Sequence, residues 1–380
     1  MKYNKFRFDE ITLNYDKKRI PLSAMERTKR QGAFRYFGAQ GVIDYVDDYI
    51  FDGKYLLIAE DGENLKSKRQ NIAQIVEGKF WVNNHAHIVQ CNDKCILEYL
   101  AYLINGKDVS GYITGSAQPK LSQANLNAME FDIPSIKEQQ DILSILLPIE
   151  QKIRINKEIN NNLLEQVLTL YRNRFVDTAN NERRICRADE YFDISIGKTP
   201  PRKEPQWFST NPQDVTWVSI SDMGTCGLYI SSSSEQLTKE AVDRHNVKIV
   251  PDNTVLLSFK LTVGRIAITN GEMTTNEAIA HFKTDKKEIN EYLYCYLKCF
   301  NYQTMGSTSS IATAVNSKII KGMPFVVPTD DELIDFHSVA APMFAKIKAN
   351  QTESEKLTAV RDTLLPKLMS GELDVSGIDL

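Results

Sequence analysis

An internal repeat constrains the fold of this chain more than any other feature of its sequence. Shifting the segment that begins at Pro134 by 194 positions aligns it, without a gap, with the segment that begins at Pro328. The matching pairs are Pro134/Pro328, Glu138/Glu332, Asp141/Asp335, Ser144/Ser338, Pro148/Pro342, Lys152/Lys346, Ile153/Ile347, Asn156/Asn350, Leu163/Leu357, Thr169/Thr363 and Leu170/Leu364. Two unrelated helices would not match so often in one register, so the sequence indicates a duplication.

Both copies of the repeat have the apolar spacing of a long helix. Seam positions, most of them apolar, alternate in steps of three and four from Ile142 to Leu170, and the second copy has its equivalent positions from Phe336 to Leu364. Such spacing is typical of a coiled-coil seam, in which a buried Asn costs stability but fixes the register. We expect these seam residues: Ile149, Ile153, Asn156, Leu163, Met343, Ile347, Asn350 and Leu357. Pro148 and Pro342 are expected to kink or start the main helices. Two unrelated amphipathic helices on separate domains are the less favoured interpretation.

Each predicted helix follows about 130–140 residues of mixed sequence, which gives the plan globular, helix, globular, helix. The expected domains are residues 1–133, 134–185, 186–328 and 329–380. Apolar runs at Thr254–Phe259 and Gly264–Thr269 predict strands, whereas Glu98–Ile104 and Glu291–Cys299 predict helices. The fold class is therefore α+β, and 380 residues suffice for two or three domains.

Composition excludes several classes of protein. No apolar run approaches the roughly 18 residues of a membrane span, and the first ten residues lack the apolar core of a signal peptide. Six cysteines without such a signal indicate reduced thiols and a cytoplasmic location. The net charge is −3, so there is no general attraction to nucleic acid, and any contact must come from local basic patches.

Catalytic motifs are absent from the sequence. The stretch Gly197-Lys198-Thr199 lacks the earlier glycine of a phosphate-binding loop, because Phe192 occupies that position. No Asn/Asp-Pro-Pro-aromatic turn of an amino-methyltransferase occurs, and Pro251-Asp252 is not followed by the acidic-x-Lys pattern of a nuclease. Cysteine and histidine spacings do not form a zinc motif, so we expect no metal site and no catalytic residue.

Basic residues gather in both globular parts. Residues 17–35 carry seven basic groups and a single acid, Glu26, and aromatic residues follow. In the second part, basic residues lie among prolines near position 200 and around a predicted turn at Gly264. Basic groups interleaved with aromatic residues suit a phosphate backbone, although the first cluster alone slightly favours a solvated loop. Together they favour two similar nucleic-acid grips held by a fixed spacer.

Four stretches of the sequence resemble the DNA specificity subunit of type I restriction–modification systems over nearly the whole chain. They are residues 195–200 (Ser-Ile-Gly-Lys-Thr-Pro) with 217–223; residues 257–267 with Asn276-Glu277-Ala278; residues 36–45 (Tyr-Phe-Gly-Ala-Gln-Gly-Val-Ile-Asp-Tyr) with 52–53, 60–62 and 80–87; and residues 364–373 (Leu-Leu-Pro-Lys-Leu-Met-Ser-Gly-Glu-Leu). The first half uses a variant opening without Gly-x-Thr-Pro. Glu277 stands where the family more often has an amide.

The resemblance implies a non-catalytic subunit that reads a bipartite double-stranded DNA target through two target recognition domains. The two helices would pack as an antiparallel coiled coil that sets the gap between the half-sites. Two methyltransferase subunits, and motor–nuclease subunits, would be its partners. The chain itself would need no cofactor, because S-adenosylmethionine, Mg²⁺ and ATP would belong to those partners.

Chemistry and position together nominate the DNA-contacting residues. They are Arg27, Lys29, Arg30, Arg35 and Tyr36 in the first part, and Lys198, Thr199, Arg202, Lys203, Lys260 and Arg265 in the second. We expect a mostly structural role for Asp44, Trp217 and Asn276. A non-catalytic coiled-coil scaffold that joins two protein-binding domains is the alternative, and a steep salt dependence of DNA affinity separates the two hypotheses. A self-contained methyltransferase or nuclease is disfavoured by the missing motifs.

Overall fold

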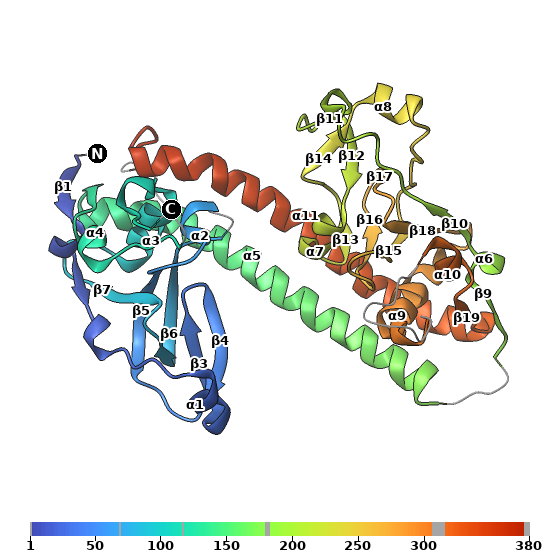
Figure 1. Ribbon diagram of the computed structural model, residues 1–380, viewed down its shortest axis with the longest axis horizontal. Coiled ribbons are helices and arrows are strands. Elements are labelled where there is room, and N and C mark those ends of the chain that lie inside the picture. The colour runs from blue at the N-terminus through green and yellow to red at the C-terminus, as the bar shows by residue number, and fades with distance from the viewer. Residues whose placement is uncertain (1, 68–69, 116–117, 179–182, 306–315, 376–380) are drawn as a thin grey trace. The chain divides into compact units, whose positions relative to one another are not determined.

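The computed structural model describes residues 2–67, 70–115, 118–178, 183–305 and 316–375 (Figure 1). The chain divides into two compact units. The first unit is Met1–Gln151 with Leu357–Leu380, and the second is Lys152–Lys356. Each unit therefore combines one globular part with portions of both long helices.

The first unit is built on a six-stranded sheet with the strand order β2-β7-β5-β6-β3-β4. Its strands are β2 (Thr12–Asn14), β3 (Gln31–Gly38), β4 (Gly41–Val46), β5 (Phe51–Ala59), β6 (Ala73–Val82) and β7 (Ala86–Cys91). A separate antiparallel pair joins β1 (Asn4–Arg7) to β8 (Glu130–Ile133). The helices of the globular part are α1 (Ala24–Lys29), α2 (Asn64–Ser67), α3 (Leu97–Gly106) and α4 (Gln123–Asn127). All pairs in the large sheet are antiparallel except β3 with β6.

The core of the first unit has apolar side chains from the sheet, from α3 and from both long helices. Leu56 and Leu100 are fully buried together with Ile142 and Leu146 of the first long helix and Leu368 of the second. The helix predicted at Glu98–Ile104 is confirmed as α3. Its apolar face packs against the sheet, which explains why a ten-residue segment is helical here although isolated helices of this length are marginal.

The second unit contains two sheets, with the strand orders β10-β18-β15-β16-β13 and β11-β14-β12-β17. The first comprises β10 (Asp193–Ile196), β13 (Tyr229–Ile230), β15 (Val255–Ser258), β16 (Ile266–Thr269) and β18 (Ile279–Lys283). The second comprises β11 (Phe208–Ser209), β12 (Val215–Val218), β14 (Glu235–Leu237) and β17 (Thr274–Thr275). β9 (Ile185–Arg187) pairs with β19 (Pro324–Val326), and the short helices are α6 (Ala188–Tyr191), α7 (Ile220–Thr225), α8 (Lys239–Arg244), α9 (Asn290–Cys299) and α10 (Ser317–Lys321). Strands β15 and β16 confirm the two strands predicted from apolar runs.

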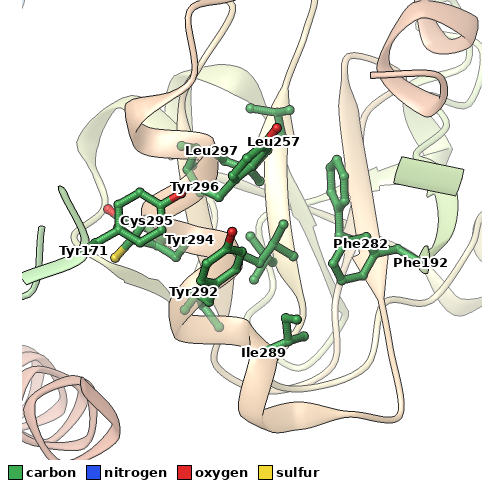
Figure 2. Close-up of a cluster of buried hydrophobic side chains, with 14 of the residues drawn as sticks. Tyr171, Phe192, Leu257, Phe282, Ile289, Tyr292, Tyr294, Cys295, Tyr296 and Leu297 are labelled. Carbon is green, nitrogen blue, oxygen red and sulfur yellow. The ribbon is translucent and has the colours of Figure 1, made fainter. Parts of the chain in front are cut away.

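Helix α9 is the centre of the core of the second unit (Figure 2). Its residues Tyr292 to Leu297 are all buried, and Figure 2 shows them between Tyr171 on one side and Leu257 and Phe282 on the other. The buried tyrosines keep their hydroxyl groups paired where they reach the backbone, because the Tyr292 hydroxyl donates to the Val326 carbonyl at 2.8 Å. The helix predicted at Glu291–Cys299 is therefore confirmed, and it is buried on almost every side.

The two long helices begin with the same capping arrangement, which accounts for part of the repeat. Helix α5 is Ile136–Tyr171 and α11 is Asp330–Ser370. The Ser135 amide donates to Glu138 Oε2 at 2.9 Å and the Thr329 amide donates to Glu332 Oε2 at 2.9 Å. Ser/Thr-x-x-Glu is the capping box that satisfies the free amides of a helix start. Pro148 and Pro342 lie inside these helices, so the alternative in which the prolines start them is wrong.

A polar layer lies where the two helices meet within the second unit. Asn156 and Asn350 are each 1 % exposed. Asn156 Nδ2 lies 2.8 Å from Glu353 Oε2 and 3.4 Å from the Asn350 carbonyl, while Asn350 Nδ2 donates to Asn160 Oδ1 at 2.8 Å. Asn160 Nδ2 in turn donates to the Ile347 carbonyl at 3.3 Å. Later residues of α5 thus meet earlier residues of α11, so the helices are antiparallel in this unit.

The other predicted seam residues lie along the same helices. Ile347 is buried in the core of the second unit, and Leu163 and Met343 pack against that core. Ile149, Ile153 and Leu357 are half-buried. In the first unit, Arg361 Nη1 of α11 lies 3.9 Å from Glu150 Oε1 of α5. The fold class is confirmed as α+β with a long helix after each globular part.

Candidate nucleic-acid interface

Helix α1 and the residue that follows it carry three of the predicted cations of the first part, Arg27, Lys29 and Arg30, and carboxylates pair with the two arginines. Ser23 caps this helix, accepting from the amide of Glu26, so the single acid in the basic stretch is a capping residue. Arg27 Nε donates to Asp44 Oδ2 at 2.9 Å, and Arg30 Nε donates to Asp47 Oδ1 at 2.9 Å. Both arginines are paired with aspartates at strand β4, in which Asp44 lies and which Asp47 directly follows. These pairs orient the guanidinium groups and neutralise part of their charge.

The two remaining cations of this group differ from those arginines. Arg35, on β3, donates from Nη2 to the Glu77 carbonyl at 2.5 Å. A carbonyl is neutral, so this bond does not compensate the charge of the guanidinium group. Lys29 is exposed at the end of α1, and in the described ranges no carboxylate lies within ion-pair distance of it. Lys29 is therefore among the exposed cations of this part that are available to an external phosphate.

The prediction that Tyr36 contacts DNA is wrong for its side chain. Tyr36 is fully buried, with Val46 and Trp81 as neighbours in a small cluster. Its hydroxyl accepts from the Leu22 amide at 2.8 Å, and the Arg27 guanidinium lies 5.3 Å from the centre of its ring. Alternation along β3 explains the outcome, since Arg35 and Tyr36 must point to opposite faces of the sheet. The Tyr36 ring therefore packs against the Arg27 guanidinium inside the protein and is not exposed to DNA.

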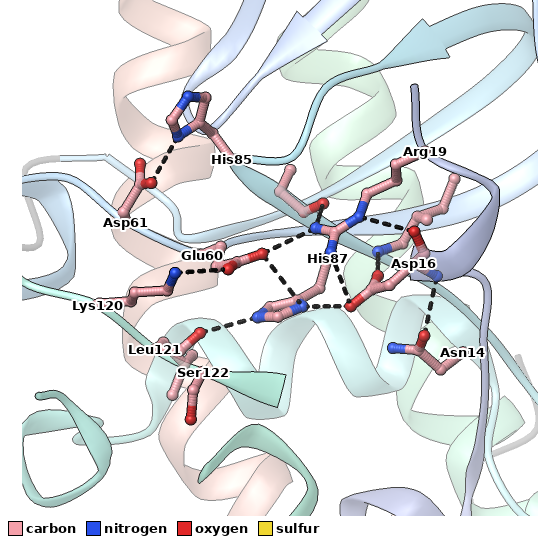
Figure 3. Close-up of polar contacts among 12 residues, drawn as sticks. Asn14, Asp16, Arg19, Glu60, Asp61, His85, His87, Lys120, Leu121 and Ser122 are labelled. Atoms are coloured by element: carbon pink, nitrogen blue, oxygen red, sulfur yellow. Dashed lines mark hydrogen bonds and ion pairs between the residues drawn. The ribbon is translucent and has the colours of Figure 1, made fainter. Parts of the chain in front are cut away.

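A buried charged network fixes the loop before α1 (Figure 3). His87, 1 % exposed, has Nδ1 at 2.6 Å from Asp16 Oδ2 and Nε2 at 2.8 Å from the Leu121 carbonyl. The ring therefore links the Asp16 carboxylate to the Leu121 carbonyl. Arg19 Nη1 adds a 2.8 Å contact to Glu60 Oε2. Arg19 is therefore used internally, although the sequence places it in the basic stretch.

This network also changes the acidity of its carboxyl groups. Burial alone would raise the pKa of Asp16, but the hydrogen bond and charge of His87 outweigh it, and the pKa is lowered overall. The pKa of Glu60 is lowered in the same way, with burial opposed by Arg19, His87 and Lys120. Both carboxyl groups are thus held ionised and compensated beneath the loop that leads to α1.

Three loops of the second unit converge around Glu277, which is exposed. The first begins at Gly197, whose Cα lies so close to the opposite loop that an added Cβ would overlap Thr275 Oγ1. Only glycine permits this approach, which brings the Thr199 hydroxyl into hydrogen-bonding contact with the Glu277 carboxylate. The third loop joins through Phe259, whose amide donates to the Ala278 carbonyl at 2.9 Å.

The Glu277 carboxylate feels the charges of two cations that the sequence nominated. Burial would raise its pKa, but the hydrogen bond from Thr199 and the charges of Lys260 and Arg202 lower it overall. Glu277 is thus an ionised acceptor inside a basic surface. The sequence marked this position only as a departure from the related family, without assigning it to the site.

The predicted residues of the 198–203 loop are held to different degrees. Arg202 makes a bidentate pair with Glu235 at 2.9 and 3.0 Å and stacks over Phe208 and Trp217. Lys198 Nζ donates to the His245 carbonyl at 2.6 Å. Lys203 is exposed, and across the described segments no carboxylate lies within ion-pair distance of it. Lys203 is therefore the counterpart of Lys29 in the first part.

Lys260 and Arg265 lie on the third loop but are not equivalent. Lys260 is exposed, whereas Arg265 donates from Nη1 to the Ile220 carbonyl at 2.6 Å and fills the space beside Gly224. Arg265 therefore braces the loop against α7. Trp217, expected to be structural, is 2 % exposed and its indole nitrogen donates to the Lys198 carbonyl at 3.2 Å.

Three of the predicted cations are held by carboxylates that the sequence analysis did not assign to the site, namely Arg27 by Asp44, Arg30 by Asp47 and Arg202 by Glu235. A signal was available for one pair of them, because Arg27 and Arg30 share their spacing with Asp44 and Asp47. Glu235 gave no comparable signal.

Among the described residues, no group of three or more His, Cys, Asp or Glu side chains could hold a metal ion. No helix in the described ranges is long and apolar enough to cross a membrane.

Comparisons with known proteins agree on one family. The model of the type I restriction modification DNA specificity domain matches residues 2–165 and 184–358. The HindI specificity subunit of Haemophilus influenzae is 22 % identical over 85 % of this chain and 84 % of its own length. The MjaIX specificity subunit of Methanocaldococcus jannaschii is 27 % identical over 74 % of this chain and 70 % of its own. The solved S subunit from M. genitalium is 14 % identical, with a TM-score of 0.59 over 97 % of this chain and 96 % of that one, which supports the fold.

Proposed function

The chain belongs to the type I restriction modification DNA specificity family, with one specificity domain in each half, and we propose that it reads a bipartite double-stranded DNA target. One half-site is contacted by the α1–β3 surface of the first part. The other half-site is contacted by the three loops around Glu277. The observation that carries the proposal is the duplication, because two matched domains in one chain suit two half-sites.

The two surfaces divide into groups with different tasks. Exposed cations without a carboxylate partner, Lys29 and Lys203, bind phosphates and position the protein. Cations that are held by carboxylates and aromatic rings, such as Arg30 and Arg202, present oriented donors to base edges, where arginine favours guanine. Glu277 repels phosphate but accepts a hydrogen bond from a base amino group, such as that of cytosine.

The long helices supply the spacing and the platform for partners. We propose that they set a constant gap between the half-sites and that two methyltransferase subunits, which carry S-adenosylmethionine, bind this chain. Motor–nuclease subunits that use ATP and Mg²⁺ join the same assembly. The chain contributes sequence recognition and no catalytic residue.

The test is to express the chain with its methyltransferase partner and to map N6-methyladenine across the host genome by single-molecule sequencing. The proposal requires a split motif with a constant gap that disappears when the chain is deleted. Replacing residues 186–328 with the matching region of a relative must then alter one half of the motif only. A stable complex that neither methylates nor binds DNA would instead support a scaffold.

A further inference from the structure

Leu261 occupies a conformation that a leucine rarely adopts. Its side chain is 100 % exposed and its backbone φ is 60°, in the left-handed region. This region costs free energy for any residue with a Cβ, and leucine has no polar group to compensate locally. The exposed side chain also gains no free energy from burial. In the isolated chain, both the backbone conformation and the exposure of Leu261 are therefore unfavourable.

The tip that carries Leu261 is held firmly. The Thr262 amide donates to the Lys260 carbonyl at 2.6 Å, which closes a three-residue turn with Leu261 at its centre. Ser258 Oγ donates to the Thr262 carbonyl at 2.6 Å and accepts from the Arg265 amide at 3.0 Å. These bonds connect the tip to strands β15 and β16. The leucine is therefore presented outward by a preorganised loop.

The charges around the tip indicate what the leucine meets. Lys260 precedes it and is exposed, and both Lys260 and Arg202 act on the neighbouring Glu277 carboxylate. An apolar side chain next to an exposed cation complements DNA, in which apolar base surfaces lie between rows of phosphates. Leucine is among the side chains that DNA-binding proteins insert at base steps, and apolar side chains also contact the thymine methyl group.

We propose that Leu261 packs against the bases of the half-site read by the second part, while Lys260 binds a neighbouring phosphate. This inference rests on the proposed function and deepens it by naming an apolar base contact. The left-handed conformation is retained because it projects the side chain beyond the surrounding loops, which a relaxed backbone would not do.

Leu261→Gly tests the proposal, since it removes the side chain and also relieves the strained backbone. The full chain in complex with its methyltransferase partner is titrated with duplex DNA that carries the methylated motif. Affinity for this DNA is expected to fall about tenfold or more, within the range of a single base contact, while non-specific affinity is unchanged. The urea midpoint is expected to stay equal or rise.

Two control variants accompany this test. Leu261→Met should keep the affinity for the motif. Ile249→Ala truncates another exposed aliphatic residue of the same unit and should not change that affinity.

Two modified duplexes distinguish the base surfaces. Uracil in place of each thymine of the half-site removes only the methyl group, and 2-aminopurine reports an opened base step by its fluorescence. Loss of affinity with one uracil, or a fluorescence rise that Leu261→Gly abolishes, identifies the contact. Unchanged motif affinity in Leu261→Gly overturns the inference, as does a loss of methyltransferase binding alone. Failure of the unaltered complex to bind the motif would instead reject the proposed function itself.

Discussion

His87 is the residue on which the buried charges of the first unit depend. Replacing it with Ala leaves the carboxylate of Asp16 without its histidine partner in a buried site. Removal of one member of a buried ion pair costs about 3–5 kcal/mol. We expect His87→Ala to lower the free energy of unfolding by about this amount, measured by urea titration with the fluorescence of Trp81 in the same unit.

His85 offers a matched control two residues away. Its side chain is 48 % exposed and its Nδ1 lies 2.6 Å from Asp61 Oδ2. Exposed ion pairs contribute at most about 1 kcal/mol. His85→Ala should therefore change stability by less than about 1 kcal/mol, and equal effects of the two substitutions would contradict a special role for the buried pair of His87 and Asp16.

His281 in the second unit behaves in the opposite way. Burial, with a smaller contribution from Lys283, lowers its pKa from 6.5 to about 3. Its ring nitrogens meet the hydroxyls of Ser195 at 3.0 Å and Thr275 at 2.7 Å, which serve a neutral ring. Above pH 6.5 the ring is neutral in both folded and unfolded chains. As the pH falls from 6.5 toward 3, only the unfolded chain gains the proton, so stability falls by up to about 1.4 kcal/mol per pH unit.

His281→Gln should flatten this pH dependence, because an amide can bridge the two hydroxyls without titrating. The measurement is urea unfolding between pH 4.5 and 7.5 in a Trp81→Phe background, where Trp207 and Trp217 report on the second unit. An unchanged slope in His281→Gln would show that the acid sensitivity arises from other groups.

At the scale of residues, the sequence could nominate side chains for the DNA interface by their chemistry, but it could not predict which of them the fold buries. Cation type and clustering nominated both surfaces, which stay predictions, whereas a single tyrosine after a basic run gives no information about the face of the strand, and the side chain of Tyr36 is buried. Glu277 was overlooked as a member of the site because it meets Thr199 through a loop crossing of 78 residues in sequence. Contacts that depend on tertiary loop packing have no local signal in one sequence.

At the scale of elements, the repeat predicted both long helices and their shared contacts. Glu138 and Glu332 match because both close capping boxes, and Asn156 and Asn350 match because both lie in the buried polar layer. Periodicity also identified α3, α9, β15 and β16. It missed strands of two residues, such as β13, whose existence depends on pairing with β16 rather than on their own sequence.

The polar layer between the helices gives a prediction for the element scale. Asn350→Ala removes the amide group that donates to Asn160, and the substitution leaves a small cavity beside Asn156. A lost buried hydrogen bond costs about 1–3 kcal/mol. We expect the free energy of unfolding of the second unit, measured by urea titration, to fall accordingly.

The matched control is the same substitution at an exposed asparagine of the same unit. Asn161 follows Asn160 on α5, and its side chain is exposed. Asn161→Ala should therefore change the free energy of unfolding by less than about 0.5 kcal/mol, as is usual for surface substitutions. Equal effects of Asn350→Ala and Asn161→Ala would contradict a structural role for the polar layer.

At the scale of the whole molecule, the net charge is −3, but the cations differ in whether a carboxylate of the chain pairs with them. The guanidinium groups of Arg27, Arg30 and Arg202 are paired with carboxylates inside the chain. Lys29 and Lys203, one in each globular part, have no such partner within the described ranges. A nearly neutral protein can therefore bind DNA through a few cations without attracting DNA along its whole surface.

This separation predicts how DNA affinity responds to salt. Each phosphate contact contributes about 0.9 to the slope of log K against log salt concentration. Lys29→Ala and Lys203→Ala are each expected to lower the slope by about that amount for every DNA sequence, and the double variant by the sum, because the proposed function has the two residues bind phosphates of different half-sites. Glu277→Gln should leave the slope unchanged or slightly steeper, while altering base preference in the second half-site only. Titrations of the methyltransferase complex at four salt concentrations, with motif DNA and with each half-site scrambled, measure both effects. Unchanged slopes in both lysine variants would assign phosphate binding to other cations, either Lys260 or the carboxylate-paired arginines, and the arginines would then have to exchange their internal partners for DNA.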